Sequence, residues 1–180
     1  EFKRLKEWKN NNILFTNNEI LSNSIINDMN IVISIAPHPD DELIGCGGLL
    51  MSKKDQGARV GIIYLTDGRS SSGWKNASSE ILNTERYQEA RNVCHSLKFD
   101  KVSYLDGVSG QLQTTSSLVN SVREFIDEFK PNGILVPFIN DPHSDHIESN
   151  KILYSALNRS QIALDEIIIL NYEVWSFVPA

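Results

Sequence analysis

Cysteine is scarce in this sequence, since only Cys46 and Cys94 occur among its 180 residues. Two thiols are too few for a disulfide framework, so a reducing compartment, and hence the cytoplasm, is the simplest expectation. We interpret both thiols as small apolar residues of the core.

Long apolar runs are missing as well. No stretch approaches the ~20 residues that a membrane span needs, and residues 1–30 hold no continuous apolar region, so we expect no signal peptide. The formal net charge of -6 argues against a general affinity for nucleic acid or for an anionic membrane surface. We therefore expect neither a membrane span nor a nucleic-acid partner.

The composition that remains is that of one globular domain. Hydrophobic residues make up 41% and charged residues 22%, which is ordinary for such a domain, and 180 residues suffice for one core. Residues 1–30, rich in Asn and Lys, are interpreted as an N-terminal extension with at most one short helix, and residues 31–180 as a single domain. Because the chain ends in an apolar run, we expect this domain to continue beyond Ala180.

From residue 31 onward, short β-branched runs alternate with amphipathic stretches. We expect strands at residues 31–36, 59–66, 101–105, 133–137 and 166–175. We expect helices at residues 42–56, 79–96, 116–129 and 145–157. This alternation predicts an α/β fold, with a Rossmann-like, doubly wound, mainly parallel sheet and helices on both faces. The commonest order of such a sheet places the fourth strand beside the first, and ligands bind at that reversal, outside the carboxyl ends of the strands.

Two polar clusters follow the first and the fourth predicted strands. Residues 36–42 read Ala-Pro-His-Pro-Asp-Asp-Glu, and residues 140–146 read Asn-Asp-Pro-His-Ser-Asp-His. They contain three of the four histidines of the chain. The predicted strand order makes the two loops face each other. Carboxylates at this density repel one another unless a cation neutralises them, so the clusters predict a metal site.

Imidazole and carboxylate groups form the ligand set of hydrolytic zinc, which takes three protein ligands and a water molecule. His38 and Asp41 lie three residues apart and can both turn inward, and His146 would supply the third ligand from the opposite loop. The same set accepts iron, cobalt or manganese, so the residues alone leave the identity of the metal open.

Hydrolysis also needs a base for the attacking water and a donor to the oxyanion. Asp40, next to the predicted ligand Asp41, is well placed to be the base. His143 would act from the opposite loop as the donor to the oxyanion and then to the leaving amine. We expect the Asp145 carboxylate to hold His143 in one tautomer. As an alternative, Asp40 and Asp145 could serve only as helix caps.

The two clusters resemble the motifs of the PIG-L/LmbE-type N-acetylglucosaminyl deacetylases. The resemblance rests on His38-Pro39-Asp40-Asp41-Glu42 and His143-x-Asp145-His146, and it runs from about residue 31 to the C-terminus. It also includes Thr66-Asp67-Gly68, Arg86-x-x-Glu89-Ala90 and Leu105-Asp106-Gly107. One departure is Ser144, which stands where the family often has proline and where no ligand is expected.

This resemblance implies a zinc-dependent amidase that removes the acetyl group from an N-acetylglucosaminyl compound, an amino-sugar substrate. It implies the same metal ligands, the same base and the same donor as the residues do. It further implies that Arg86 and Asp106 contact the sugar or its aglycone. Arg86 could instead pair only with Glu89, one helical turn away, and Asp106 before Gly107 could be only a turn residue.

Two other functions stay open. The substrate could be a different amide, or the sheet could belong to a non-catalytic, Rossmann-like domain that binds a sugar or a nucleotide. The run Gly45-Cys46-Gly47-Gly48 invites the nucleotide interpretation, but it lacks the G-x-G-x-x-G spacing and comes too late after the first strand. We expect these glycines to allow close packing of a helix on the sheet.

Overall fold

The computed structural model describes residues 23–68 and 79–174, and within them five strands form one parallel sheet. The strands are β1 (Ile31–Ala36), β2 (Arg59–Thr66), β3 (Lys101–Gly107), β4 (Gly133–Pro137) and β5 (Ile168–Tyr172). Their order in the sheet is β3-β2-β1-β4-β5, and every neighbouring pair is parallel. The predicted α/β fold is confirmed, and so is the position of the fourth strand beside the first.

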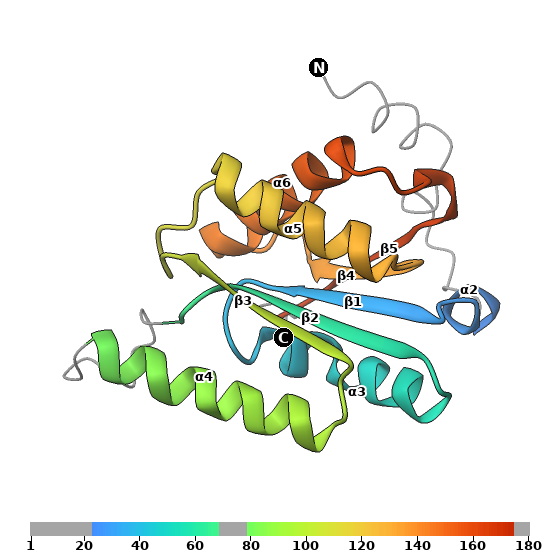
Figure 1. Ribbon diagram of the computed structural model, residues 1–180, viewed down its shortest axis with the longest axis horizontal. Coiled ribbons are helices and arrows are strands. Elements are labelled where there is room, and N and C mark those ends of the chain that lie inside the picture. Colours follow the sequence, from blue (N-terminus) through green and yellow to red (C-terminus); the bar gives the residue numbers. More distant parts are fainter. Residues whose placement is uncertain (1–22, 69–78, 175–180) are drawn as a thin grey trace, which may run out of the picture.

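Helices cover both faces of this sheet (Figure 1). On one face lie α3 (Asp41–Asp55) and α4 (Ser79–Ser96), and on the other lie α5 (Ser116–Phe129) and α6 (Ser144–Arg159). A short helix, α2 (Asn23–Asn27), precedes β1, and a 3-10 turn, η2 (Leu164–Glu166), precedes β5. Residues 1–22 of the predicted extension and residues 175–180 at the C-terminal end lie outside the described part of the chain.

The boundaries differ from the predicted ones at several elements. Strand β3 runs two residues further than expected, to Gly107, and α6 spans 144–159 instead of 145–157. The last strand is shorter than the predicted 166–175, because Glu166 belongs to η2 and Ile167 donates its N–H back to Leu164 O. A tight turn of this kind occupies backbone groups that a strand would offer to its neighbour.

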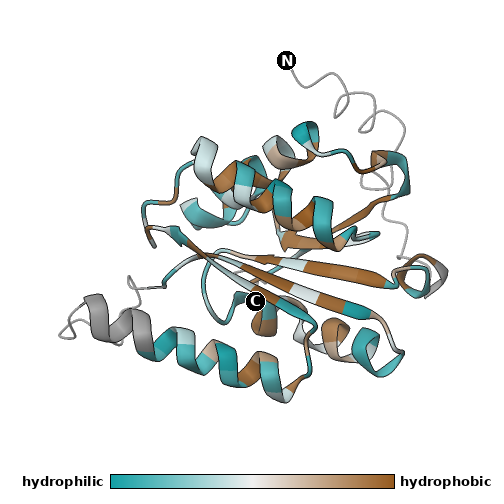
Figure 2. Cartoon of the chain, viewed as in Figure 1, coloured by the Kyte–Doolittle hydropathy of each residue, from teal (hydrophilic) through white to brown (hydrophobic). Residues whose placement is uncertain are grey.

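The core consists of two layers, one on each face of the sheet. Alternating side chains of β1 divide between them: Ile33 and Ile35 pack with α5 and α6, whereas Val32 and Ala36 pack in the cluster that includes residues of α3 and α4. Figure 2 shows the strands as a largely hydrophobic slab between helices that are hydrophilic outside. Strands buried on both faces explain the uninterrupted apolar runs of the sequence.

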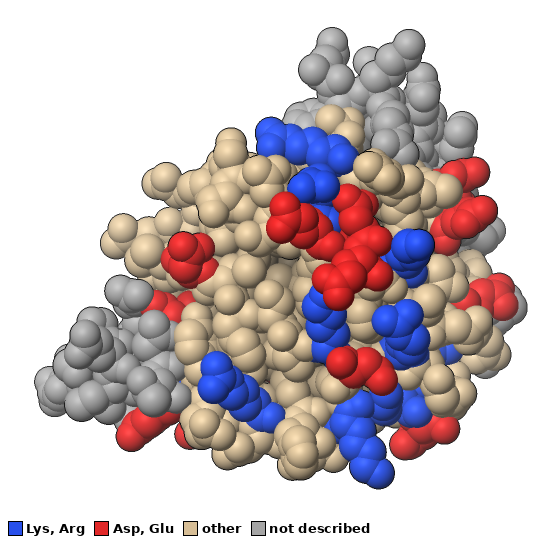
Figure 3. Space-filling view, viewed as in Figure 1, with Lys and Arg blue, Asp and Glu red and all other residues tan. Residues whose placement is uncertain are grey.

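The surface in Figure 3 carries basic and acidic side chains interspersed. On α5, Arg123 pairs with Glu124 and Asp127. Within the described ranges, no helix is both long enough and apolar enough to cross a membrane.

In the sheet, Ser34 of β1 lies opposite Leu135 of β4. The segments that follow these two parallel strands therefore leave the sheet side by side at its carboxyl edge.

Candidate metal centre

His38 and His146 come from segments more than 100 residues apart, and their ring centroids are 5.6 Å from each other. His38 lies in the loop after β1, and His146 lies in the first turn of α6. Both rings turn toward the same carboxylate oxygen, Asp41 Oδ2, which is 3.0 Å from His38 Nδ1 and 3.3 Å from His146 Nε2. The structure thus brings the three predicted ligands together at the point where β1 and β4 are neighbours.

The start of each helix explains how these side chains are held. Asp41 is the first residue of α3, and its Oδ2 accepts the backbone N–H of His38 at 2.9 Å, which closes the loop after β1. A carboxylate in this first turn is also favoured by the helix dipole. At α6 the N-cap is His143, whose side chain accepts the N–H of Asp145. The two helix starts therefore present their ligands from opposite sides of one site.

The three predicted ligands form a donor set of the kind that binds a metal ion. His146 is fully buried, and among the described residues neither of its ring nitrogens forms a hydrogen bond, although carboxylate oxygens lie 3.1 and 3.3 Å away. Three nitrogens crowd around Asp41 Oδ2, namely the His38 N–H, His38 Nδ1 and His146 Nε2. In a tetrahedral zinc site, ligand atoms are about 3.3–3.5 Å apart, close to these separations. The types of donor atom and their separations therefore fit a metal ion.

The cluster has a second grouping. The ligand atoms of His38, Asp41 and His146 lie within 4.8 Å of one another, and so do those of His38, His143 and Asp145. The first grouping is the one predicted. The second shares His38 and arises because Asp145 binds the other nitrogen of that ring.

Burial and charge shift the pKa values in opposite directions. Burial alone would lower the pKa of His38, but its hydrogen bonds to Asp145 and Asp41 raise that pKa to about 9. Burial would likewise raise the pKa of Asp41, but the imidazoles of His146 and His38 hold it well below its usual range. A carboxylate that stays ionised while almost fully buried is a strong attractor for a cation.

Each of the two predicted histidine ligands has a carboxylate on its far nitrogen. His38 Nε2 donates to Asp145 Oδ2 at 2.9 Å, and His146 Nδ1 lies 3.1 Å from Asp141 Oδ2. Such partners orient a ligating imidazole and make it more basic. Sequence reasoning assigned no role to Asp141, although its place inside the second cluster was the available signal.

Asp145 differs from the sequence-based expectation. Its buried carboxylate accepts the N–H groups of Gly110 (2.6 Å) and Leu112 (3.1 Å) as well as His38, whereas only its backbone N–H reaches His143, at 3.2 Å from Nδ1. The segment after β3 brings two N–H groups to this carboxylate, and together with the His38 ring they hold it in place. The alternative of a capping role for Asp145 is also wrong, because the cap of α6 is His143 itself.

Asp40 and Arg86 form an ion pair, with Arg86 Nη2 at 2.9 Å from Asp40 Oδ2. Asp40 has a positive φ of 122° and a side chain that is 54% exposed, and that side chain does not cap α3. Burial of the carboxyl group raises the pKa of Asp40, and the charge of Arg86 opposes that rise. The guanidinium of Arg86 also donates to the carbonyls of Pro39 and Gly68, and the predicted contact of Arg86 with substrate stays a prediction.

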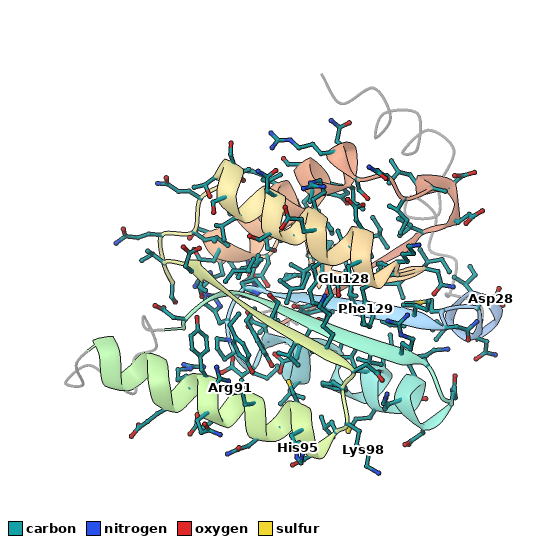
Figure 4. All side chains as sticks on the ribbon, in the orientation of Figure 1. Asp28, Arg91, His95, Lys98, Glu128 and Phe129 are labelled. Carbon is teal, nitrogen blue, oxygen red and sulfur yellow. The ribbon has the colours of Figure 1, made fainter. Side chains whose placement is uncertain are left out.

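Asp106 is exposed at the carboxyl end of β3. In the described part of the chain it forms no hydrogen bond or ion pair with the histidine cluster, so its predicted contact with substrate stays a prediction. The fourth histidine, His95, lies on the outer side of α4, away from the sheet (Figure 4).

Comparison with known proteins bears directly on this arrangement. Residues 33–157, which contain both polar clusters, match the family model PIG-L, described as GlcNAc-PI de-N-acetylase. The chain belongs to the PIG-L family. The resemblance predicted from the two motifs is thereby confirmed.

Two curated proteins and one solved structure are similar to this PIG-L domain. Diacetylchitobiose deacetylase of Thermococcus kodakarensis is 31% identical over 130 residues, which are 69% of this chain and 48% of that protein. Probable N-acetyl-alpha-D-glucosaminyl L-malate deacetylase 2 of Bacillus subtilis is 30% identical over 137 residues, 72% of this chain and 62% of that protein. The chain thus spans less than two thirds of the length of either relative.

The solved structure is N,N'-diacetylchitobiose deacetylase from Pyrococcus horikoshii in complex with an inhibitor. It superposes with a TM-score of 0.71 at 20% identity, covering 96% of this chain and 69% of that chain. At this identity the likeness concerns the fold, and it agrees with the parallel sheet described above.

Proposed function

We propose that this PIG-L domain is a zinc-dependent hydrolase that removes the acetyl group of an N-acetylglucosaminyl-type substrate, releasing acetate and a free amino sugar. The observation that carries the proposal is the convergence of His38 Nδ1 and His146 Nε2 on Asp41 Oδ2, in a buried place where His146 has no hydrogen-bond partner among the described residues. The names of both curated relatives support an acetylated amino sugar as the substrate.

His38, Asp41 and His146 would hold the metal ion. When bound there, zinc supplies a polarised acetamide carbonyl and a water molecule whose pKa is lowered toward about 7. Asp145 and Asp141 keep the two imidazoles oriented by their contacts with the far ring nitrogens.

Asp40 takes the proton of the attacking water. Its half-exposed carboxylate stands beside the ligand Asp41, and Arg86 fixes its Oδ2. As the C–N bond breaks, the same carboxyl group returns this proton to the nitrogen of the leaving amine. The neutral amine and acetic acid result, and acetic acid loses its own proton to solvent at neutral pH to give acetate. One carboxylate thus serves as base and then as acid.

His143 stabilises the oxyanion as a neutral donor. Because its Nδ1 accepts the Asp145 N–H, the ring proton is on Nε2. Burial, followed by the neighbouring His38 and His146, lowers the pKa of His143, which favours the neutral ring. A neutral N–H group aimed at the developing negative charge lowers the barrier without a proton transfer. In this proposal the leaving amine therefore receives its proton from Asp40, whereas the sequence led us to expect it from His143.

The test combines elemental analysis of the purified protein with a free-amine assay on diacetylchitobiose, an N-acetylglucosaminyl malate and unrelated N-acetyl amides. We expect one metal ion per chain and release of amine from the acetylated amino sugars. His146→Ala should lose the metal, whereas Asp40→Asn should keep it and lose roughly 10²–10⁴-fold in turnover. His95→Ala is the matched control and should change neither.

Three results would contradict the proposal in different ways. Unchanged metal content in His146→Ala would remove His146 from the ligand set. Activity only on the unrelated amides would assign a different substrate. A protein without stoichiometric metal and without turnover would favour a non-catalytic binding domain. Location in the cytoplasm remains an expectation from the cysteine content.

A further inference from the structure

One guanidinium group joins three segments beside the metal cluster. Arg86, on α4, donates from Nη2 to Asp40 Oδ2 (2.9 Å) and to Pro39 O (2.7 Å), and from Nη1 to Gly68 O (3.4 Å). Its side chain is only 11% exposed. The loop after β1 and the residues after β2 are thereby tied to the same side chain of α4. The planar guanidinium of arginine has several N–H donors in fixed directions and can bridge three segments, whereas the ammonium group of lysine lacks this geometry.

Asp40 has a backbone conformation that needs such support. Its φ of 122° and ψ of -25° are rarely adopted by residues other than glycine. Its N–H donates to Glu42 Oε2 at 3.2 Å, and its carbonyl accepts from Leu43 N and Ile44 N at 3.0 Å each. Strained positions of this kind persist only where the surroundings hold them firmly, and they cluster at functional sites.

Glu42 is itself held in place by the core. It is fully buried, and its Oε1 accepts the hydroxyl of Tyr64 at 2.7 Å. The backbone of Asp40 is therefore held by the first turn of α3, and its side chain is held by Arg86. The two supports come from opposite sides of the residue.

Gly68 lies tightly against the same guanidinium. Its φ is +66°, and a Cβ atom there would lie 3.0 Å from Pro39 Cδ, 3.1 Å from Arg86 Nε and 3.3 Å from Arg86 Cζ. A side chain at this position would be strained by its backbone and would also push on Arg86. The packing leaves the guanidinium little room to move away from Asp40.

We propose that Arg86 is a positioning residue for the base, which holds the Asp40 carboxylate in its reactive place, and that it does not contact the substrate. The inference rests on the role proposed above for Asp40. It differs from the role that the family resemblance implies for Arg86, because Nη2 donates to Asp40 and Pro39 and Nη1 donates to Gly68 within the protein.

The first experiment compares Arg86→Met with Arg91→Met in the metal-loaded protein, by free-amine release. Arg91 lies on the same helix and stacks over Tyr104 of β3, 5.4 Å from the ring centroid (Figure 4). We expect Arg86→Met to lower kcat roughly 10- to 100-fold while KM changes less than about threefold, because a misplaced base slows the chemistry without weakening binding. Arg91→Met should keep both constants. A raised KM with unchanged kcat in Arg86→Met would overturn the proposal.

Two further variants separate positioning from general damage. In Arg86→Ala, millimolar guanidinium should restore part of kcat, because the free ion can bind Asp40 in place of the missing side-chain guanidinium. Gly68→Ala should lower kcat in the same direction as Arg86→Met, with its metal content kept. Absence of rescue together with a normal kcat in Gly68→Ala would count against the proposal.

A double-mutant cycle tests the link between the two residues directly. If Arg86 acts through Asp40, adding Arg86→Met to Asp40→Asn should cost no further turnover. The same cycle is measured by thermal unfolding. The fall in Tm of the double mutant should be smaller than the sum of the falls in Tm of the two single mutants. That readout needs no activity, so it remains decisive if the wild type releases amine from no substrate and the proposed function fails. Additive losses of turnover would overturn the role of Arg86, and so would additive falls in Tm if the wild type turns over no substrate.

Discussion

Asp141 Oδ2 lies 3.1 Å from His146 Nδ1, the ring nitrogen that faces away from Asp41. The other oxygen of Asp141 accepts the backbone N–H of His143 at 2.9 Å, so one buried carboxylate holds both histidines of the second cluster. A carboxylate in this place fixes the direction of the ring and increases its basicity toward a metal. Asp141 is therefore a supporting residue of the candidate metal centre, next to the three predicted ligands.

Asp141→Asn should weaken metal binding by roughly 10- to 100-fold, because the amide can still accept from His143 N but no longer carries the charge that supports His146. The measurement is competition for the metal with a chromophoric chelator. Asn140→Ala, at the exposed neighbouring residue, is the control and should bind as the wild type does. Equal affinity in the two variants would show that the contact is incidental.

Asp145→Asn should lower the free energy of unfolding by about 2–4 kcal/mol, because charged hydrogen bonds to Gly110 N, Leu112 N and His38 are lost or weakened in a fully buried place. Urea unfolding measures the change. Asp165→Asn, on the exposed side of η2, should have little effect. A stable Asp145→Asn variant that is impaired only in turnover would instead restore the expected pairing with His143.

Gly45→Ala and Gly48→Ala should have opposite effects on stability. A Cβ atom at Gly45 would lie 2.1 Å from Tyr172 Cδ2, and that ring is anchored by its hydroxyl to Ile35 O at 2.8 Å. We expect a loss of about 1–3 kcal/mol for Gly45→Ala from overpacking. At exposed Gly48 a Cβ meets none of the described atoms within 4 Å, so alanine should add up to about 1 kcal/mol through its helix propensity. The denaturant midpoints of both variants and the wild type, measured in the same buffer, show whether each substitution lowers or raises stability.

Asp100 should make stability depend on pH in the acidic range. Burial alone would raise its pKa, but hydrogen bonds from Lys54 Nζ (2.6 Å) and Val60 N (2.7 Å) lower it below the unfolded value. Its contribution is therefore complete above the unfolded pKa of about 3.9 and is lost as the pH falls through the lower folded pKa. Because a third of the side chain is exposed, we expect less than about 1 kcal/mol.

The difference in unfolding free energy between wild type and Asp100→Asn, measured from pH 2 to pH 7, checks this expectation. It should be constant at neutral pH and shrink only in acid. Asp55→Asn, on the exposed side of α3, serves as the control for the loss of one negative charge. A difference that grew in acid would contradict the assigned direction of the pKa shift.

The glycine run in α3 shows how much of the packing the sequence pattern predicts and where the prediction stops. Its interpretation as close packing on the sheet is confirmed at Gly45, which contacts Tyr172 of β5, but Gly48 is exposed and packs against nothing described. The boundary of β5 shows a similar limit, since Glu166, predicted to begin the strand, belongs to η2 and Ile167 is the C-cap of that turn. Apolar character identifies buried segments, whereas the choice between a turn and a strand depends on which backbone groups lie next to them.

What the sequence determined by itself was the alternation of strands and helices, the neighbourhood of β1 and β4, and the two clusters whose His38, Asp41 and His146 meet at their common edge. These follow from the periodicity of apolar residues and from chain topology, which a sequence records directly. Only the tertiary structure decided that Asp145 binds His38 and Gly110, and that Arg86 binds Asp40. Each of these partners lies more than 30 residues away along the chain, and a hydrogen bond is specified by a few tenths of an ångström and by an angle. Such precision arises only when the packed elements fix the position of both side chains.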